Sequence, residues 1–298
     1  MQLWSSEQST AVPDSWIGQR VGAWVIVQQL HEGDWSRLFA AQPFDAAGSS
    51  RVDYVLKVAR RDTARAALAA ASVQREAVVG GAVHHPNLIA VLDSGTIDQQ
   101  SYVAMPRLDG ANLARTLALH AIQAVPVALW WTRQLASAMA AMHAAGWCHG
   151  NIKPAHVMVG LRGHLTLFDL GNARAINSVC SGIRPAIAFA APETLQEQAV
   201  AQAASDIYSL GLVLHQMLTG WDPLEIEPAA LAADRRVGKH PPKPAGGASA
   251  PPQAVERLLE AMLELRPEHR PSASEVCQSL LAVETKSLSD FINPARAA

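Results

Sequence analysis

The chain has 298 residues, more than one domain usually contains, so we expect a large core divided between two lobes. Its formal net charge of −2 excludes an overall basic surface for nucleic acid, and none of its apolar stretches is long and uninterrupted enough to span a membrane. We therefore expect no nucleic-acid partner and no membrane span.

Residues 21 to 107 read mostly as strands. β-branched and aromatic residues lie between turn signals in five stretches, at 23–30, 36–43, 53–60, 87–95 and 101–108. An Ala-rich stretch at 63–83 is typical of a helix and falls between the third and fourth strands. These patterns predict a β-rich unit with one helix.

From residue 108 onward the pattern favours helices. The stretch 126–146 predicts a helix with one buried face, because four large apolar residues recur at helical spacing, namely Trp131, Leu135, Met139 and Met142. Gly146 is a typical residue for the end of that helix.

Three more segments follow. Residues 205–220 are apolar nearly all round, which predicts a helix at the centre of the second lobe. Residues 238–253 are rich in Pro and Gly without periodicity, which predicts a surface loop, and residues 255–265 return to a helical pattern.

Short motifs fall in a fixed order between residues 21 and 283: "YVLK" ending at Lys57, "REA" with Glu76, "HPNL" from His85, "HGNIKP", "FDLG" with Asp169, "APE" ending at Glu193, "SDIYSLG" with Asp206 and "RPEHRPS" with Arg270. With these motifs at these spacings, the chain resembles bacterial Ser/Thr protein kinases. The resemblance implies an α+β, bilobal fold with a small β-rich N-lobe containing one helix and a larger helical C-lobe. The expected boundaries are an N-terminal extension at 1–20, the N-lobe at 21–107, the C-lobe at 108–283 and a C-terminal tail at 284–298.

The resemblance assigns nucleotide and metal contacts to particular residues. Lys57 would hold the α- and β-phosphates of ATP and Glu76 would orient Lys57, although the pair could instead only brace the helix against the sheet. Asp169 would bind Mg²⁺ at one site. The resemblance places six further residues around the nucleotide: Gly33, Leu38, Val55, Met105, Arg107 and Met158.

The loop that covers the phosphates in this family is degenerate here. The segment "HEGDWSRL" keeps only the middle glycine, Gly33, and has His31 and Ser36 at the two flanking glycine positions. Glycine lets backbone amides approach phosphates without a Cβ in the way. With Trp35 adding bulk at the loop tip, we expect ATP to bind weakly.

The catalytic loop has lost its reacting groups. Asn151 stands where the family has the Asp that accepts a hydrogen bond from the substrate hydroxyl, and a carboxamide takes up no proton near neutral pH. His156 replaces an Asn that would hold a second Mg²⁺, and imidazole suits softer metals. Lys153 is retained for a local hydrogen bond or a phosphate contact. A zinc site at His149 and His156 is not expected, because no Cys or acidic ligand joins them in the sequence.

Two further departures surround the same centre. Gly150 removes an Arg that in many kinases receives an activation-loop phosphate, and Ala186 stands where Ser/Thr kinases usually have a Thr. The scaffold residues Glu193, Asp206 and Arg270 are kept. The resemblance implies that Glu193 pairs with Arg270 and that Asp206 holds the backbone of the catalytic loop.

Cysteine use and the N-terminal residues bear on the compartment. Cys148, Cys180 and Cys277 are too few and too scattered for a disulfide framework. The opening "MQLWSSEQSTAVPDSW" lacks a basic segment followed by an apolar run and does not resemble a secretion signal. We expect a cytoplasmic protein.

The residues therefore predict a pseudokinase, a protein with the kinase fold that acts in signalling by binding a protein partner. That partner would be a kinase, a phosphatase or a phosphopeptide-binding module. Two alternatives stay open: slow phosphate transfer to Ser or Thr by an unconventional catalytic loop, and transfer of a nucleotidyl group from ATP. Phe291 and Ile292 in the C-terminal tail could dock on a surface, although a frayed end is the simpler expectation.

Overall fold

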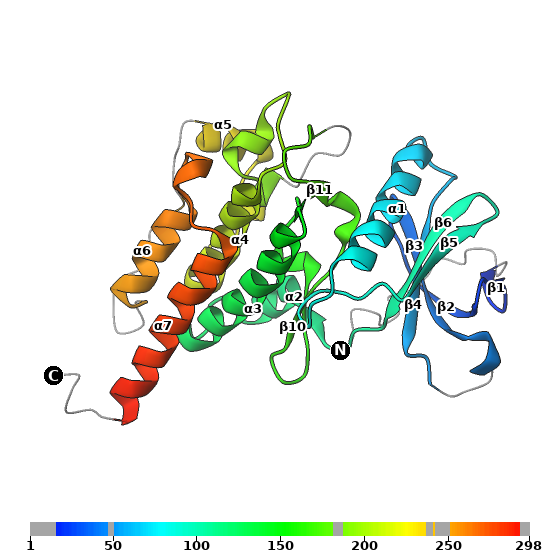
Figure 1. Cartoon of the computed structure of the whole chain (residues 1–298), viewed down its shortest axis with the longest axis horizontal. Helices are drawn as coiled ribbons and strands as arrows, with labels where there is room; N and C mark the ends of the chain where they lie inside the picture. The colour runs from blue at the N-terminus through cyan, green and yellow to red at the C-terminus, as the bar shows by residue number, and fades with distance from the viewer. Residues whose placement is uncertain (1–15, 47–50, 181–186, 237–240, 242–250, 293–298) are drawn as a thin grey trace.

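The computed structural model describes residues 16–46, 51–180, 187–236, 241 and 251–292. The chain forms two lobes, a sheet with one helix on one side and a bundle of helices on the other (Figure 1). The expected bilobal α+β arrangement is confirmed. Within the described parts of the chain, no helix is both long and apolar enough to cross a membrane.

The N-lobe is an antiparallel sheet with the strand order β1-β2-β3-β4-β6-β5. Helix α1, Ala66–Ala82, connects β4 to β5 and packs on the sheet (Figure 1). The strands are β1 Arg20–Val21, β2 Trp24–Glu32, β3 Ser36–Pro43, β4 Tyr54–Ala59, β5 Asp93–Ile97 and β6 Gln100–Pro106, with the 3₁₀ turn η2 Phe44–Ala46 after β3.

The described end of the expected N-terminal extension packs on this sheet. The rings of Trp16 and Phe39 stack with their centroids 5.5 Å apart, and the amide of Gly18 donates to the carbonyl of Ile26 at 2.9 Å. Residues 16–20 are therefore part of the N-lobe surface.

The strand predicted at 87–95 is wrong in its first half, because β5 begins only at Asp93. Leu88 and Ile89 instead lie in the C-lobe core, where the amide of Ile89 donates to the carbonyl of Leu167 at 2.9 Å. A short apolar run is typical of a strand whichever lobe buries it, so the pattern could not show that Leu88 and Ile89 pack in the C-lobe.

The C-lobe is built from helices with short strands between them. Its helices are α2 Leu113–Leu119, α3 Val125–Ala144, α4 Ala203–Thr219, α5 Pro228–Arg236, α6 Gln253–Met262 and α7 Ala273–Ile292. Its strands are β7 Ala111–Asn112, β8 Trp147–Cys148, β9 Val157–Val159, β10 Leu165–Leu167 and β11 Arg174–Ala175. The 3₁₀ turns are η3 Pro154–His156, η4 Leu170–Asn172, η5 Ile187–Phe189, η6 Pro192–Leu195, η7 Pro223–Glu225 and η8 Pro267–His269.

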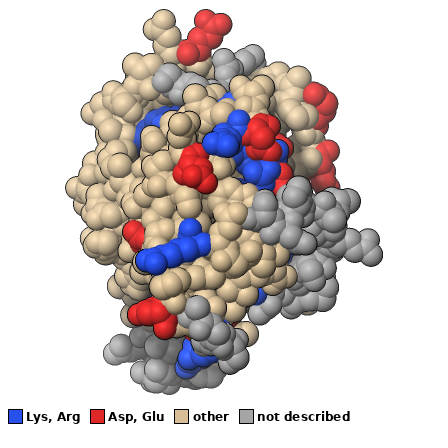
Figure 2. Space-filling view, turned by 90° about the vertical axis from the view of Figure 1, so that its right-hand side faces the viewer, with Lys and Arg blue, Asp and Glu red and all other residues tan. Residues whose placement is uncertain are grey.

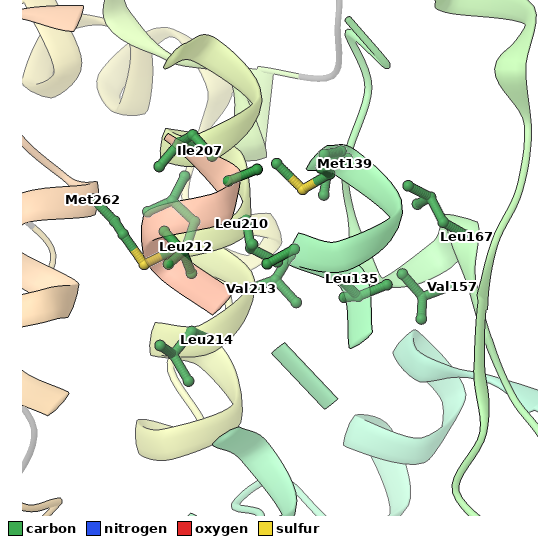
Figure 3. Packing of buried hydrophobic residues seen from close by; sticks show 14 of the residues in the cluster. Leu135, Met139, Val157, Leu167, Ile207, Leu210, Leu212, Val213, Leu214 and Met262 are labelled. Atoms are coloured by element: carbon green, nitrogen blue, oxygen red, sulfur yellow. The ribbon is translucent and has the colours of Figure 1, made fainter. Parts of the chain in front are cut away.

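Helices α3 and α4 form the centre of the C-lobe core. Side chains from both helices meet there with Val157 and Leu167 (Figure 3). The four residues predicted to line the buried face of α3 are all buried, and nearly every residue of α4 is buried as expected. Gly146 (φ 82°) and Gly220 (φ 72°) lie just beyond the ends of α3 and α4, in the left-handed region that favours glycine.

The segments near the C-terminus differ from expectation mainly in their bounds. The helix predicted at 255–265 is α6, and most of the loop predicted at 238–253 lies outside the described residues. Helix α7 runs through the boundary expected at 283, and Glu284 pairs with Arg133 of α3 at 2.9 Å.

At the N-lobe end of the molecule, basic and acidic side chains lie intermixed on the face in view (Figure 2).

Candidate functional site

A cavity of about 280 Å³ lies between the N-lobe sheet and the C-lobe. Eight of the residues assigned to the site line it: Leu38, Val55, Lys57, Glu76, Met105, His156, Met158 and Asp169. The described residues that complete its lining are His31, Ser36, Ile89, Pro106, Leu108 and Phe168. Gly33, Arg107, Asn151 and Lys153 are not among the lining residues.

The cavity has an apolar end and a polar end. Side chains of β3, β4, β6 and the segment after β6 supply the apolar part of the lining, while Lys57, Glu76 and Asp169 supply the polar part. A slot of this kind fits a ligand with a flat apolar ring system at one side and anionic groups at the other. The residues present therefore fit a nucleotide, with Lys57 as the cation at its phosphate end.

Lys57 lies between two carboxylates. Its Nζ is 2.6 Å from Glu76 Oε2 and 2.6 Å from Asp169 Oδ1. Burial alone would lower the pKa of Lys57, but the neighbouring carboxylates of Asp169 and Glu76 raise it well above its usual value. Lys57 is therefore charged, and it links α1 of the N-lobe to the C-lobe segment that carries Asp169.

The two carboxyl groups respond to this ammonium differently. Burial outweighs the attraction of Lys57 and raises the pKa of Glu76, whose side chain is only 1% exposed. Burial would also raise the pKa of Asp169, but Lys57 and His156 hold it well below its usual range. Asp169 is therefore a carboxylate, and its backbone is left-handed at φ 68°.

His156 contacts the second oxygen of that carboxylate. Its Nε2 is 3.2 Å from Asp169 Oδ2, and its Nδ1 is 3.0 Å from the carbonyl oxygen of Asn151. Burial lowers the pKa of His156 to about 4, against the opposing attraction of Asp169, so the ring is neutral at pH 7. Both oxygens of Asp169 are thus in contact with protein side chains. Within the described residues, no group of three or more His, Cys, Asp or Glu side chains is arranged to hold a metal ion.

The backbone of the catalytic loop is hydrogen-bonded to the side chain of Asp206. Its carboxylate accepts hydrogen bonds from the amides of His149 at 2.7 Å and Gly150 at 2.8 Å, and it lies 3.0 Å from His143 Nε2. Burial opposes these contacts, but the hydrogen bond to His143 leads the interactions that lower the pKa of Asp206. The sequence-based expectation that Asp206 holds this loop agrees with the geometry.

The imidazole of His149 has a defined tautomer. Its Nε2 lies 3.2 Å from the carbonyl oxygen of Phe168 and its Nδ1 accepts from the amide of Asn151 at 3.3 Å, so the proton resides on Nε2. Burial lowers the pKa of His149, which keeps the ring neutral. His149 therefore positions the backbone on both sides of the reaction centre.

Gly150 has a conformational role that its sequence position did not reveal. Its φ is 74°, and a Cβ at this position would stand 2.9 Å from the carbonyl oxygen of Asn172. Most side chains are strained at positive φ, so glycine suits this backbone. The sequence alone indicates only that an Arg is lost at this position.

Lys153 and Asn151 lie beside the cavity rather than in its lining. Lys153 lines a second cavity of about 400 Å³ next to α2, the end of α4 and η7. Burial lowers the pKa of Lys153, and Asp169 opposes that effect, so the two charges lie within electrostatic reach. Asn151 lines a smaller hollow with Ile152 and Phe189.

Trp35 lies in the turn between β2 and β3. Its side chain is partly buried against a cluster of four residues, of which Ala69 and Val73 lie on α1, and it is not among the residues that line the cavity. Burial of its apolar surface favours this packing, while the weak ATP binding expected from the loop stays a prediction.

The retained scaffold pair is in place. Arg270 Nη1 and Nη2 donate to the two oxygens of Glu193 at 2.6 and 2.9 Å, and the Arg270 side chain is fully buried. Further hydrogen bonds run from Arg270 to the carbonyls of Ala204, Glu264 and Leu265. Ala186, the other position assigned to the reaction centre, lies outside the described residues.

Comparisons with known proteins give one consistent result. A family model for the protein kinase domain matches residues 28–281. The serine/threonine-protein kinase PrkC of Bacillus subtilis is 26% identical over 264 residues, which cover 87% of this chain and 40% of PrkC. The serine/threonine-protein kinase pkn3 of Myxococcus xanthus is 29% identical over 293 residues, covering 92% of this chain and 52% of pkn3. PknE of Mycobacterium tuberculosis is 30% identical over 202 residues, 66% of this chain and 35% of PknE. The chain thus spans about a third to a half of the length of these curated relatives.

Proposed function

The chain belongs to the protein kinase family, and from that premise we propose that it is a pseudokinase that acts by binding a protein partner. One observation carries the proposal. The carboxylate of Asp169, which the family uses for Mg²⁺, has Lys57 2.6 Å from one oxygen and His156 3.2 Å from the other. Side chains of the protein thus contact both oxygens of the carboxylate that would bind a metal ion.

The reaction needs more than this carboxylate. Phosphoryl transfer depends on positioning and on neutralising the charge of the transferred group, and Mg²⁺ bound with ATP supplies much of that neutralisation. Asn151 offers a carboxamide where the family uses a carboxylate to accept the proton of the substrate hydroxyl. Loss of such a base typically costs about 10² to 10⁴ in rate.

We infer that nucleotide binding is weak and nearly independent of Mg²⁺. Lys57 would contact the phosphates, and the apolar slot around Val55 and Met105 would hold the base. Because Lys57 already pairs with Glu76 and Asp169, a bound nucleotide competes with those carboxylates for one ammonium group.

The partner is a kinase, a phosphatase or a phosphopeptide-binding module in this proposal. Support comes from the scaffold, since Glu193, Arg270 and Asp206 keep the contacts that define the C-lobe while the reacting groups are replaced. A surface of fixed shape suffices for binding, whereas catalysis needs groups aligned with the transition state.

A slow kinase is the second candidate. The Lys57–Glu76 pair at 2.6 Å and the charge of Lys153 near Asp169 support it, because these groups serve the phosphates in active members of the family. Transfer of a nucleotidyl group is the third possibility that the assays below would detect.

The proposal is tested by isolating the native complex and repeating the isolation with Lys57→Met and Asp169→Asn. Both variants should keep the complex if binding is the function, and circular dichroism checks that they fold. Loss of the complex in both folded variants would indicate a nucleotide-gated switch, in which ATP binds two states with different affinity.

A further inference from the structure

Backbone contacts within the protein fix the turn between β2 and β3. The amide of Gly33 donates to the carbonyl of Ser36 at 2.9 Å, and the carbonyl of Gly33 accepts from Arg60 Nη1 at 3.0 Å. The carbonyl of Trp35 accepts from the amide of Arg60 at 2.9 Å. The amide of Gly33, the one glycine kept in this loop, is therefore already engaged within the protein, and the contacts of the two carbonyls fix the conformation of the turn.

Ionic contacts hold this turn against the end of β4. Arg37 lies 3.1 Å from Glu32 and 2.6 Å from Asp62, while Arg60 lies 3.2 Å from Glu32 and 3.0 Å from Asp62. Trp35 packs on α1 at the same end. A turn with this many fixed contacts is a rigid edge of the cavity, so a ligand must be met by side chains that already point inward.

Two such side chains are present, His31 and Ser36, and both line the cavity. In the strand register His31 lies opposite Leu38, and Leu38 lies opposite Lys57. Directly opposed residues of antiparallel strands point to the same face, so these three side chains form one row across the ceiling of the cavity. With strands about 4.8 Å apart, His31 lies roughly 10 Å from Lys57 along that row.

The charge balance of the cavity calls for a further donor. Lys57 already faces two carboxylates at 2.6 Å, so the polar end has no unpaired ammonium group for an anionic ligand. His31 is exposed, and among the described residues no side chain or carbonyl bonds to its ring. An imidazole and a hydroxyl are both competent hydrogen-bond donors to phosphate oxygens.

We propose that His31, assisted by Ser36, contacts the phosphates of a bound nucleoside di- or triphosphate and replaces the backbone cradle of the glycine-rich loop. This assignment rests on the nucleotide site proposed above. It makes the two residues at the missing glycine positions ligand-binding groups. Adenosine, which has no phosphate, would not use them.

Dissociation constants for adenosine, ADP and ATP test the assignment, measured by calorimetry in EDTA so that no metal ion contributes. His31→Ala should weaken ATP and ADP about three- to tenfold, the usual size for loss of one hydrogen bond, and leave adenosine unchanged. Ser36→Ala should act in the same direction. His31→Lys should restore ATP binding, because the ammonium is again a donor to phosphate.

His84→Ala is the matched control, since His84 is exposed and outside the cavity lining. Equal weakening of ATP and adenosine by His31→Ala, or no weakening of either, would overturn the role of His31 while leaving the nucleotide site intact. If the wild type binds none of the three ligands at millimolar concentration, the nucleotide site itself is absent and this inference is wrong with it. Either result would leave the proposed partner binding to be judged by the native complex.

Discussion

His156 lies against Asp169, with its Nε2 3.2 Å from Oδ2, while Lys57 contacts the other carboxylate oxygen, Oδ1. Both contacts come from positions that serve the nucleotide and its metal in active members of the family. The substitution at 156 therefore does more than remove a metal ligand, because the new side chain also covers the ligand that was kept.

Restoring the lost groups should restore some chemistry. The wild type is expected to transfer no γ-phosphate from ATP to itself or to a generic substrate above a control without protein. Asn151→Asp with His156→Asn returns the proton acceptor and the second metal ligand, so partial activity should appear in a radiolabel assay. Activity stays partial, because groups that act as one unit are not additive.

Two results of the same assay would contradict the pseudokinase proposal. Phosphate transfer by the wild type that disappears in Asp169→Ala would mean that Asn151 and one metal ion suffice, and the chain would be a slow kinase. Label transferred from the α-phosphate instead of the γ-phosphate would identify nucleotidyl transfer.

Metal dependence should change with residue 156. In the wild type, any rise in melting temperature caused by millimolar ATP should be small and similar in Mg²⁺ and in EDTA. His156→Asn frees Asp169 Oδ2, so the shift should become larger in Mg²⁺ than in EDTA. Lys57→Ala should remove the shift in both. A wild-type shift that requires Mg²⁺ would contradict the proposed covering of Asp169.

The buried ion pair of the C-lobe should dominate its stability. Arg270→Ala removes the guanidinium that pairs with the carboxylate of Glu193 and the three hydrogen bonds that Arg270 donates to carbonyls, and a cost of about 3 to 5 kcal/mol in the free energy of unfolding is expected. Urea denaturation measures the loss. Arg51→Ala is the control, because the Arg51–Asp53 pair is exposed and should contribute little. Equal effects of the two substitutions would contradict this account.

Returning an arginine to position 150 should destabilise the chain. Gly150→Arg places a Cβ 2.9 Å from the carbonyl of Asn172 on a backbone with φ 74°, and such strain costs about 1 to 3 kcal/mol. Gly150→Ala should cost about the same, since the Cβ alone causes the contact. Thermal denaturation of both variants tests this prediction. A higher melting temperature of Gly150→Arg than of the wild type would contradict it and would show that this loop can relax.

The buried histidines should make the fold weaker in mild acid. Burial lowers the pKa of His149 and lowers that of His156 to about 4, whereas histidine in an unfolded chain titrates near 6.5. Between these values the unfolded chain binds more protons, so the free energy of unfolding falls as the pH drops below about 6.5. The urea midpoint should decrease from pH 7 to pH 5, and less so in His156→Asn. A constant midpoint would contradict the buried neutral rings.

The sequence was informative where a side chain's role follows from its own pattern. The apolar residues of α4 predicted burial without a partner being known, and the order of motifs placed Lys57 and Glu76 where they meet at 2.6 Å. Spacing along strands and helices fixes these features, so they can be read from one chain.

Features that depend on distant backbone were not accessible in this way. The contact between His156 and Asp169 depends on how two loops fold together, and the left-handed φ of Gly150 depends on the path around Asp206. The packing of Trp35 against the cluster that includes Ala69 and Val73 could not be predicted, because nothing in its local sequence specifies that α1 passes nearby.

The pair Arg270–Glu193 joins residues that are 77 positions apart in the sequence, which affects the order in which the chain can fold during synthesis. Neighbouring N-lobe strands such as β2, β3 and β4 pair with one another and can assemble soon after they leave the ribosome. The C-lobe must wait, because Glu193 has no arginine until residue 270 emerges and α3 lacks α7 until later still. In that interval the face of α3 that packs on α7 and the face of α4 that packs on α6 are uncovered, so this lobe is the part of a nascent chain that chaperones would bind.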